Sequence, residues 1–270
     1  MPQPKDPRQP VALVTGASSG IGAALAHCFA ESGHDLVLVA RSADKLEALG
    51  ADLSQRHGVK TWAVPADLSL PDAAAKLAAA MKRARRPIDV LVNNAGVLEY
   101  GAFVKMPAAR HQQLIDLNVS GLTAMLAHFV PPMVARGRGR VLNVASIASF
   151  QPVPSLATYA ATKAYVLSLT ESMSEELKGS GVTLTALCPG ITATDMLGAA
   201  QEASASLKQL PRFVVGDAQA VAREGHDACL RGEVIRVPGA LNLAAVVAAR
   251  ATPKWLLRQV SGAVARRGMK

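Results

Sequence analysis

Short apolar runs separated by longer segments of mixed polarity make up most of this chain. The runs at 11–15 (VALVT) and 35–40 (DLVLVA) consist almost entirely of apolar residues and do not alternate with polar ones. Such runs are typical of strands that are buried on both faces of a sheet. The segments between them, such as 43–57, repeat apolar residues at helical spacing. The pattern therefore predicts strands that alternate with helices.

This alternation predicts a doubly wound α/β fold, in which helices cover both faces of a parallel sheet. The strands are expected within 11–15, 35–40, 60–69, 88–96, 139–146, 181–190 and 233–237, and the helices at 23–33, 43–57, 71–86, 107–135 and 155–179. Pro131 and Pro132 are expected to bend the last turn of the fourth helix. No linker or repeat interrupts the pattern. We therefore expect one domain over 1–270, with a core of about 10–237 and a basic helical C-terminal extension of about 238–270.

Composition narrows the class of protein. Half of the 270 residues are hydrophobic and 18% are charged, which supplies a full core and argues against disorder. Cys28, Cys188 and Cys229 lie far apart, and their odd number argues against a disulfide framework. The first residues, MPQPKDPRQP, lack the apolar stretch of a signal peptide, and no apolar run approaches the roughly 20 residues that span a bilayer. These features predict a cytoplasmic protein with reduced thiols.

The net charge of +9 belongs mainly to the C-terminal tail. Residues 234–270 contain seven Lys or Arg and no Asp or Glu, whereas the other 22 basic and 20 acidic residues nearly cancel. A nucleic-acid-binding protein usually spreads basic side chains over a binding face. The distribution therefore argues against a nucleic-acid partner.

A glycine-rich turn follows the first predicted strand. Gly16, Gly20 and Gly22 are spaced G-x-x-x-G-x-G between a strand and a helix. Glycines at such a turn let the backbone approach a pyrophosphate, and the helix N-terminus favours the anion. The Gly-Lys-Ser/Thr sequence of nucleotide triphosphatases is absent. Turn chemistry alone would also select glycine, but the strand–turn–helix context favours a nucleotide cofactor.

Tyr159 and Lys163 lie four residues apart in a predicted helix, and therefore on one face. A nearby ammonium favours the phenolate, so we expect Lys163 to lower the pKa of Tyr159 and to make the phenol a usable proton donor or acceptor. An isolated pair of this spacing is more often an ordinary surface contact. The residues around it decide between the two interpretations.

Those residues carry a family resemblance. The motifs TGASSGIG (15–22), NNAG (93–96), Asn118, Ser146, YAATK (159–163) and PG (189–190) occur in the order and spacing of the short-chain dehydrogenase/reductase family. The chain resembles this family from about residue 10 to about residue 197. The resemblance implies a Rossmann fold with a seven-stranded parallel sheet, and an NAD(P)-dependent oxidoreductase.

The resemblance also implies catalytic roles for Asn118, Ser146, Tyr159 and Lys163. Tyr159 would exchange a proton with the reacting oxygen, Ser146 would hydrogen-bond that oxygen, and Lys163 would lower the tyrosine pKa and hold the nicotinamide ribose. Asn118 would help to hold a water in a proton relay. Two simpler roles stay open: Ser146 as a helix or turn cap, and Asn118 as a buried amide satisfying the backbone. Related enoyl reductases place the tyrosine six residues before the lysine, so the spacing of four argues against double-bond reduction.

The expected cofactor is NADP(H), with NAD(H) as the alternative. Enzymes that prefer NAD carry an acid after the second strand, where this chain has Arg41. A guanidinium can pair with a 2′-phosphate, although many NADP-preferring relatives also have a basic residue at the position of Ser19. Asp67 would contact the adenine, or else cap the helix that follows. The expected cofactor-binding residues are Gly16, Ser18, Ser19, Gly20, Ile21, Gly22, Arg41, Ser42, Asp67, Leu68, Asn94, Ala95, Gly96, Tyr159, Lys163, Pro189, Gly190, Ile191 and Thr194.

The substrate is expected to be a lipophilic ketone or aldehyde. Its pocket walls are predicted at Phe150, Val153, Met196, Leu197 and Phe213, and residues 196–213 are expected to form a helical lid over it. The sequence thus predicts an NADPH-dependent carbonyl reductase. The alternative is a catalytically silent NADP(H)-binding sensor or scaffold, which would have no need of Tyr159.

The tail between Pro253 and Arg267 places Leu256, Leu257, Val260 and Val264 on one helical face, with Lys254 and Arg258 opposite. It could pack on the domain or a second subunit, border the substrate entrance, or lie on an anionic membrane surface as a peripheral contact. Packing is the favoured interpretation. By analogy with the family, a homodimer or homotetramer built on 107–135 and 155–179 is expected. No metal site is predicted.

Overall fold

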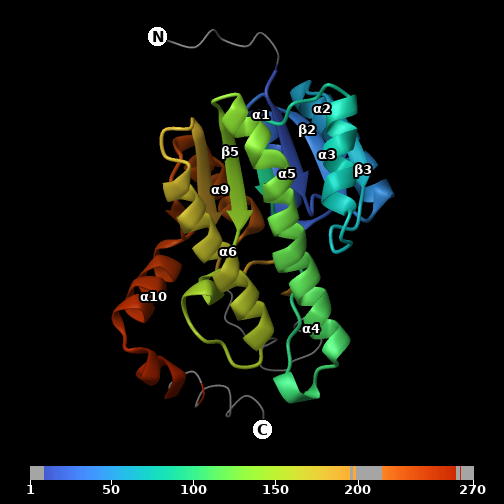
Figure 1. Cartoon of the computed structure of the whole chain (residues 1–270). Helices are drawn as coiled ribbons and strands as arrows, with labels where there is room; N and C mark the ends of the chain where they lie inside the picture. Colours follow the sequence, from blue (N-terminus) through green and yellow to red (C-terminus); the bar gives the residue numbers. More distant parts are fainter. Residues whose placement is uncertain (1–8, 195–196, 199–214, 260–261, 263–270) are drawn as a thin grey trace.

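A computed structural model of the chain describes residues 9–194, 197–198, 215–259 and 262. Its centre is one parallel seven-stranded sheet in the order β3-β2-β1-β4-β5-β6-β7 (Figure 1). The strands are β1 (Val11–Thr15), β2 (Asp35–Ala40), β3 (Thr61–Pro65), β4 (Val90–Asn93), β5 (Gly139–Val144), β6 (Val182–Leu187) and β7 (Ile235–Arg236). This architecture confirms the predicted seven-stranded Rossmann fold. The strand order changes direction between β1 and β4, as a doubly wound sheet requires.

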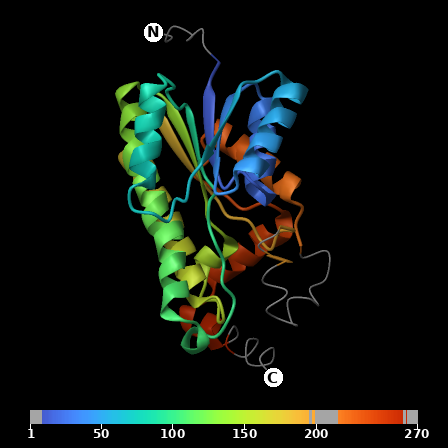
Figure 2. The same cartoon turned by 90° about the vertical axis from the view of Figure 1, so that its right-hand side faces the viewer.

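Helices cover both faces of the sheet (Figure 2). One layer contains α3 (Ala73–Arg83), α5 (Leu122–Ala135) and α6 (Ala157–Glu176), and the other contains α1 (Gly20–Glu31), α2 (Ala43–His57) and α9 (Ala218–Arg231). Successive β1 side chains point to opposite faces of the sheet. Leu13 packs in the hydrophobic core beneath α3, α5 and α6, and Val14 packs in the core beneath α1, α2 and α9. Every β1 and β4 side chain is buried, which explains their continuous apolar sequences.

The predicted helix at 107–135 is one helical run with an irregular centre. It comprises α4 (Ala108–Ile115), the π-helical turn η2 (Asp116–Gly121) and α5, and it contains Pro131 and Pro132 near its end. An 18-residue window of this 28-residue run has a mean hydropathy of 1.3, so by length and composition the run could span a bilayer, contrary to the sequence expectation. Its buried side chains, including Leu126, Phe129 and Met133, pack in the core. Core packing therefore accounts for this apolarity.

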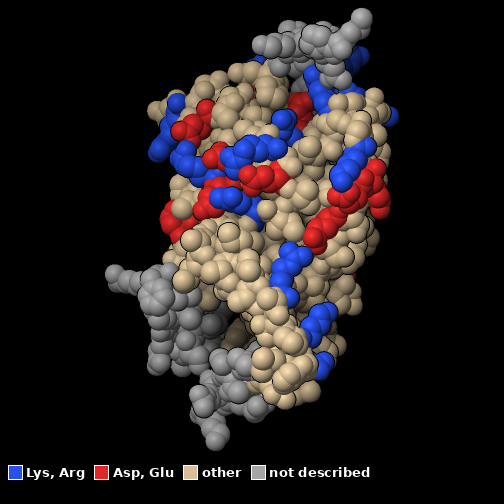
Figure 3. Space-filling view, turned by 90° about the vertical axis from the view of Figure 1, so that its left-hand side faces the viewer, with Lys and Arg blue, Asp and Glu red and all other residues tan. Residues whose placement is uncertain are grey.

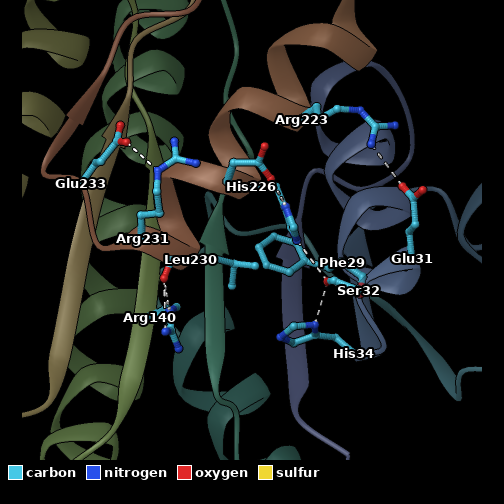
Figure 4. Close-up of polar contacts among 11 residues, drawn as sticks. Phe29, Glu31, Ser32, His34, Arg140, Arg223, His226, Leu230, Arg231 and Glu233 are labelled. Carbon is cyan, nitrogen blue, oxygen red and sulfur yellow. Dashed lines mark hydrogen bonds and ion pairs between the residues drawn. The ribbon is translucent and has the colours of Figure 1, made fainter.

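A partly buried polar contact joins the end of α1 to α9 near the amino-terminal end of the sheet (Figure 4). Ser32 Oγ lies 3.0 Å from His34 Nδ1 and 3.0 Å from His226 Nε2. The Phe29 ring packs edge-on against both imidazoles. The contact fixes the connection between α1 and β2 against α9, which is almost 200 residues further along the chain.

The C-terminal extension is helical where the structure describes it. Helix α10 (Ala240–Ala251) lies beside the domain, and residues 254–259 are also helical (Figure 1). Leu256 and Leu257 of the predicted apolar face lie in this second segment, while Val260 and Val264 lie outside the described residues. Two short 3-10 turns, η1 (Phe103–Lys105) and η3 (Ile147–Phe150), complete the elements that surround the site.

Candidate active site

The carboxyl ends of the strands surround a cavity of about 810 Å³. The segments that follow β1 to β6 all contribute to its lining, as expected for the ligand site of a doubly wound sheet. The predicted residues that line it are Gly16, Ser18, Ser19, Gly20, Ile21, Arg41, Ser42, Asp67, Leu68, Asn94, Ala95, Gly96, Ser146, Val153, Tyr159, Lys163, Pro189, Gly190, Ile191, Thr194 and Leu197. Gly22, Asn118 and Phe150 do not line it. Met196 and Phe213 lie outside the described residues.

Ser146 and Tyr159 lie close together, and both line this cavity. Ser146 follows β5 and starts η3, where its Oγ accepts the Ala148 N–H at 3.1 Å. Ser146 therefore caps the turn, and its own proton stays available to another oxygen. Burial raises the pKa of Tyr159, and the neighbouring Ser146 hydroxyl lowers it by less. The phenol is accordingly protonated at neutral pH, the form that a proton donor needs.

Lys163 lies one helical turn after Tyr159, and its side chain is buried. Its Nζ donates to the Val144 carbonyl at 2.8 Å and lies 5.8 Å from the centre of the Tyr159 ring. Burial lowers the pKa of Lys163 to about 8. Burial is the largest influence on the pKa of Tyr159, and the Lys163 ammonium donates to a backbone carbonyl, so the expectation that Lys163 lowers the pKa of Tyr159 stays a prediction.

Asn118 supports the site from outside the cavity. Its Oδ1 accepts the Val97 N–H at 2.9 Å, and its Nδ2 donates to the Val97 carbonyl at 2.9 Å and to Thr162 Oγ1 at 3.1 Å. Both side-chain N–H groups are therefore used within the protein. The simpler prediction of a buried amide holds for this side chain, which joins the π-helical turn η2 to the segment after β4 and to α6. π-helical turns inside α-helices often occur at functional sites.

The glycine-rich turn has the geometry of an anion-binding loop. Gly16 has a φ of +63° and Gly20 a φ of +56°, and a Cβ on Gly20 would lie 2.9 Å from Thr194 Cγ2. Ser19 precedes α1 without capping it through its side chain, and the first turn of α1 has no acid. The free N–H groups at this helix start, with the helix dipole, suit a phosphate. The turn thus fits a dinucleotide.

Gly22 was predicted to contact the cofactor, but it does not line the cavity. A Cβ at Gly22 would lie 2.1 Å from the Gly16 carbonyl oxygen and 2.4 Å from Asn94 Nδ2. Asn94 Nδ2 donates to the Thr15 and Gly16 carbonyls at 3.0 and 3.1 Å. Gly22 therefore allows close packing beneath the loop and is not a contact residue. Thr15, which is not among the predicted cofactor-binding residues, supports the loop because its Oγ1 accepts the Asn94 and Ala95 N–H groups.

Arg41 and Asp67 lie at the rim of the cavity. Arg41 is exposed after β2, with Ser42 beside it. Asp67 Oδ1 accepts the Ser69 hydroxyl at 2.7 Å and the Ser69 N–H at 3.0 Å, and these bonds, helped by the charge of Arg41, lower the pKa of Asp67. Helix α3 is preceded by Asp72, so Asp67 does not cap it. A cavity-lining role remains for both residues.

The remaining wall of the cavity was not predicted. It adds the apolar side chains Val97, Leu98, Leu117 and Leu156 and the polar side chains Glu99, Arg110, Gln113 and Gln151. Tyr100, which the sequence indicated as a packing or pocket residue, also lines the cavity. Arg110 pairs with Glu99 at 3.4 Å. These residues come from the loop after NNAG, from α4 and η2, and from the loop after η3, where no motif marks them. The wall is thus mixed rather than only lipophilic.

Phe150 is a correction to the predicted pocket. Its ring packs against the core and lies 5.6 Å from the Arg250 guanidinium of α10, because it ends η3 on the side that meets this helix. Among the described residues, no group of three or more His, Cys, Asp or Glu side chains could hold a metal ion.

Comparisons with known proteins agree with this geometry. A family model described as short chain dehydrogenase matches residues 10–205. Glycine betaine reductase ATRR from Emericella nidulans is 38% identical over 208 residues, which cover 77% of this chain but only 16% of that protein. The solved structure of a short-chain dehydrogenase from Sphingobium yanoikuyae in complex with NADPH is 37% identical in sequence to this chain, with a TM-score of 0.79. The aligned region covers 89% of this chain and 93% of that one.

A second solved structure is similar to this chain over most of its length. The bulky-bulky ketone specific alcohol dehydrogenase from Comamonas testosteroni is 31% identical to this chain, with a TM-score of 0.76. The aligned region covers 89% of this chain and 92% of that one.

Proposed function

Since the chain belongs to the short-chain dehydrogenase family and is an oxidoreductase, we propose that it uses NADPH to reduce a bulky ketone or aldehyde to the alcohol. The observation that carries this proposal is that the hydroxyl side chains of Ser146 and Tyr159 lie close together in the wall of the cavity, with the buried Lys163 one helical turn after Tyr159. The pair places two hydroxyl donors where one carbonyl oxygen can meet both. Such donors stabilise the negative charge that develops on that oxygen in the transition state.

The bound dinucleotide would supply the hydride to the carbonyl carbon. Ser146 donates its hydroxyl proton in a hydrogen bond to the carbonyl oxygen, because Ala148 already occupies one of its acceptor positions. Tyr159 transfers its phenolic proton to the same oxygen, which becomes the alcohol. Burial keeps the phenol protonated before the reaction, since it raises the pKa of Tyr159. Asn118 and Val144 hold η2 and Lys163 in register with this pair.

NADP(H) is the cofactor that suits the cavity rim. The start of α1 offers backbone N–H groups to the pyrophosphate, and Arg41 with Ser42 offers a guanidinium and a hydroxyl to a 2′-phosphate. The Sphingobium relative was solved with NADPH, which supports this choice. NAD(H) has no phosphate with which Arg41 could pair.

The mixed wall of the cavity favours a bulky substrate. Val97, Leu98, Val153 and Leu156 can contact an apolar body, while the Glu99–Arg110 pair can contact a polar group. The relative from Comamonas is described as specific for bulky-bulky ketones, which agrees with a large pocket.

Titration of the purified protein with NADPH and NADH, followed by NADPH oxidation with ketones and aldehydes graded in size, tests the proposal. We expect NADPH to bind at least about tenfold more tightly than NADH, the size of one charge-assisted hydrogen bond. Arg41→Ala should remove most of this difference and leave NADH binding unchanged. If NADH binds as tightly as NADPH, the cofactor assignment is wrong. If NADPH binds but no carbonyl compound is reduced, the reductase assignment is wrong.

A further inference from the structure

Helix α10 exposes an apolar face to solvent. Leu241, Leu243 and Val247 are 64%, 49% and 59% exposed. Asn242, Val246 and Ala249, spaced i, i+4 and i+7, form the opposite face, which packs on the domain. The other exposed residues before Arg250 are Ala240, Ala244, Ala245 and Ala248, so this stretch of surface carries no polar side chain. A surface helix of a globular protein normally places charged and polar residues there.

The apolar surface continues past α10. In the helical segment 254–259, Trp255 is 55% exposed and Leu256 is 37% exposed. Both segments run along the same edge of the molecule (Figure 1). We call the set of Leu241, Leu243, Val247, Trp255 and Leu256 the C-terminal apolar surface. Contiguous exposed apolar surface of this kind usually marks a binding site for a protein or a membrane.

The charges around this surface have one sign. Arg250 and Lys254 lie between and beside its apolar residues and are exposed, and the sequence has no Asp or Glu from 234 to its end at 270. In the view that faces α10, the lower part of the molecule is mostly uncharged with a few basic side chains, while the acidic side chains gather above (Figure 3). A partner of this surface must therefore offer apolar groups to its exposed apolar side chains and negative charge to its basic ones.

A second copy of this chain fits these charges poorly. A two-fold dimer through the C-terminal apolar surface would bring Arg250 and Lys254 toward their own equivalents, with no acid in the segment to neutralise them. Spanning a bilayer is also excluded for α10, because its 12 residues are about 18 Å long and the hydrocarbon core is about 30 Å thick.

We propose that the C-terminal apolar surface binds an anionic lipid bilayer, with α10 lying in the plane of the interface. Leu241, Leu243 and Val247 enter the boundary between headgroups and acyl chains, and Trp255 lies at headgroup level. Arg250 and Lys254 meet the anionic headgroups. The contact needs no unfolding, because α10 stays anchored while its outer face binds: Val246 and Ala249 are buried against the domain, and Asn242 Nδ2 donates to the Pro238 carbonyl at 2.9 Å.

Co-sedimentation of the full-length protein with vesicles tests this proposal without any need for turnover. We expect binding to phosphatidylcholine vesicles that contain phosphatidylserine, little binding to phosphatidylcholine alone, and weaker binding as salt is raised. Replacement of both Leu243 and Val247 by Glu should abolish binding. Lys254→Ala should weaken it about fivefold at low salt. Val104→Glu is the matched control, because Val104 is 90% exposed in η1, outside this surface, and its variant should bind like the wild type.

Tryptophan emission gives a second, independent readout. The chain has two tryptophans, and Trp62 is partly buried in β3, where the Arg86 guanidinium lies 3.5 Å from its ring centre. A blue shift on adding anionic vesicles should therefore survive Trp62→Phe and be lost in Trp255→Phe. The proposal is overturned if wild-type protein does not bind anionic vesicles at low salt, or if both vesicle types bind it equally. It is also overturned if, in sedimentation velocity without lipid, the double Glu variant dissociates a wild-type oligomer, because a second copy then covers the surface.

Discussion

At the scale of single residues, Lys163 shows how the site and the stability of the fold oppose one another. Its ammonium has one backbone acceptor, Val144, and almost no contact with water. Burial lowers its pKa to about 8, so the folded protein disfavours the charged form relative to the unfolded chain. A residue retained under such conditions serves function rather than stability.

Lys163→Met should therefore stabilise the cofactor-free protein, by about 1–3 kcal/mol at pH 7, and abolish turnover. The lysine pKa is about 8 in the folded state and about 10.5 in the unfolded state, so the wild type gains stability only as pH rises from 8 to 10.5. The advantage of the variant should accordingly be constant below pH 8 and shrink above it. Thermal unfolding from pH 6 to 10 measures this. An equal or lower stability of the variant at pH 7 would contradict the described burial.

Tyr159 leads to a prediction on the direction of the reaction. Because burial raises its pKa above the ordinary value of 10, the proton donor is intact throughout the neutral range. The kcat/KM for carbonyl reduction should stay level from pH 6 to 9, while alcohol oxidation, which needs the phenolate as acceptor, should rise with pH across that range. Initial rates in both directions check this, and a reduction rate that falls steadily above pH 7 would argue against the burial of Tyr159.

At the scale of elements, the turn between β1 and α1 carries a constraint that its neighbours lack. Gly20 and Gly33 both have positive φ, +56° and +80°. A Cβ on Gly20 would meet Thr194, whereas nothing lies within 4 Å of a Cβ on Gly33. Substitution of the two glycines therefore distinguishes the cost of a positive φ, which both share, from a steric clash with Thr194, which only Gly20 would have.

Gly20→Ala should weaken NADPH binding by at least about tenfold, because the loop must shift away from Thr194. Gly33→Ala is the matched control, with a loss of about 1 kcal/mol in stability and unchanged cofactor affinity. Isothermal titration and chemical denaturation of both variants measure the two effects. Equal loss of affinity in the two variants would show that the loop does not form the cofactor site.

The contact between α1 and α9 makes a prediction about acid stability. Burial, followed by the nearby His226, lowers the pKa of His34 below its ordinary value of 6.5. The unfolded state then binds the proton more readily, so this contribution is complete above pH 6.5 and is lost as pH falls toward the folded pKa. His34→Gln should make the loss of stability between pH 7 and 5 shallower. Urea unfolding at each pH gives the free energy of unfolding. If its change between pH 7 and 5 is the same in His34→Gln as in the wild type, His34 does not contribute to the loss of stability in acid.

At the scale of the whole molecule, the sequence predicted the strands of the sheet more accurately than the directions in which side chains point. Strands such as β2 are buried on both faces, so their apolar runs mark them to within a residue. The motifs identified the cavity, because TGASSGIG, NNAG, Ser146 and PG each follow a strand whose carboxyl end faces it. The direction of the Phe150 ring depends on its contact with Arg250 of α10, which is distant in sequence, so the motifs did not show that this ring leaves the cavity wall. The partners of Asn118 and Lys163, Thr162 and the Val144 carbonyl among them, could likewise not be derived from the motifs. The polar wall at Glu99 and Arg110 has no local signal at all.

The central claim is that Tyr159 donates the proton in carbonyl reduction, and the most direct test is NADPH oxidation by Tyr159→Phe with the best ketone of the graded panel. The account predicts a fall in kcat of at least about 1,000-fold with NADPH affinity unchanged. Tyr165→Phe is the control, because it removes an exposed phenol on the same helix that bonds Thr123 Oγ1 at 2.8 Å, and it should retain full activity. Turnover by Tyr159→Phe within about tenfold of the wild type would contradict the account.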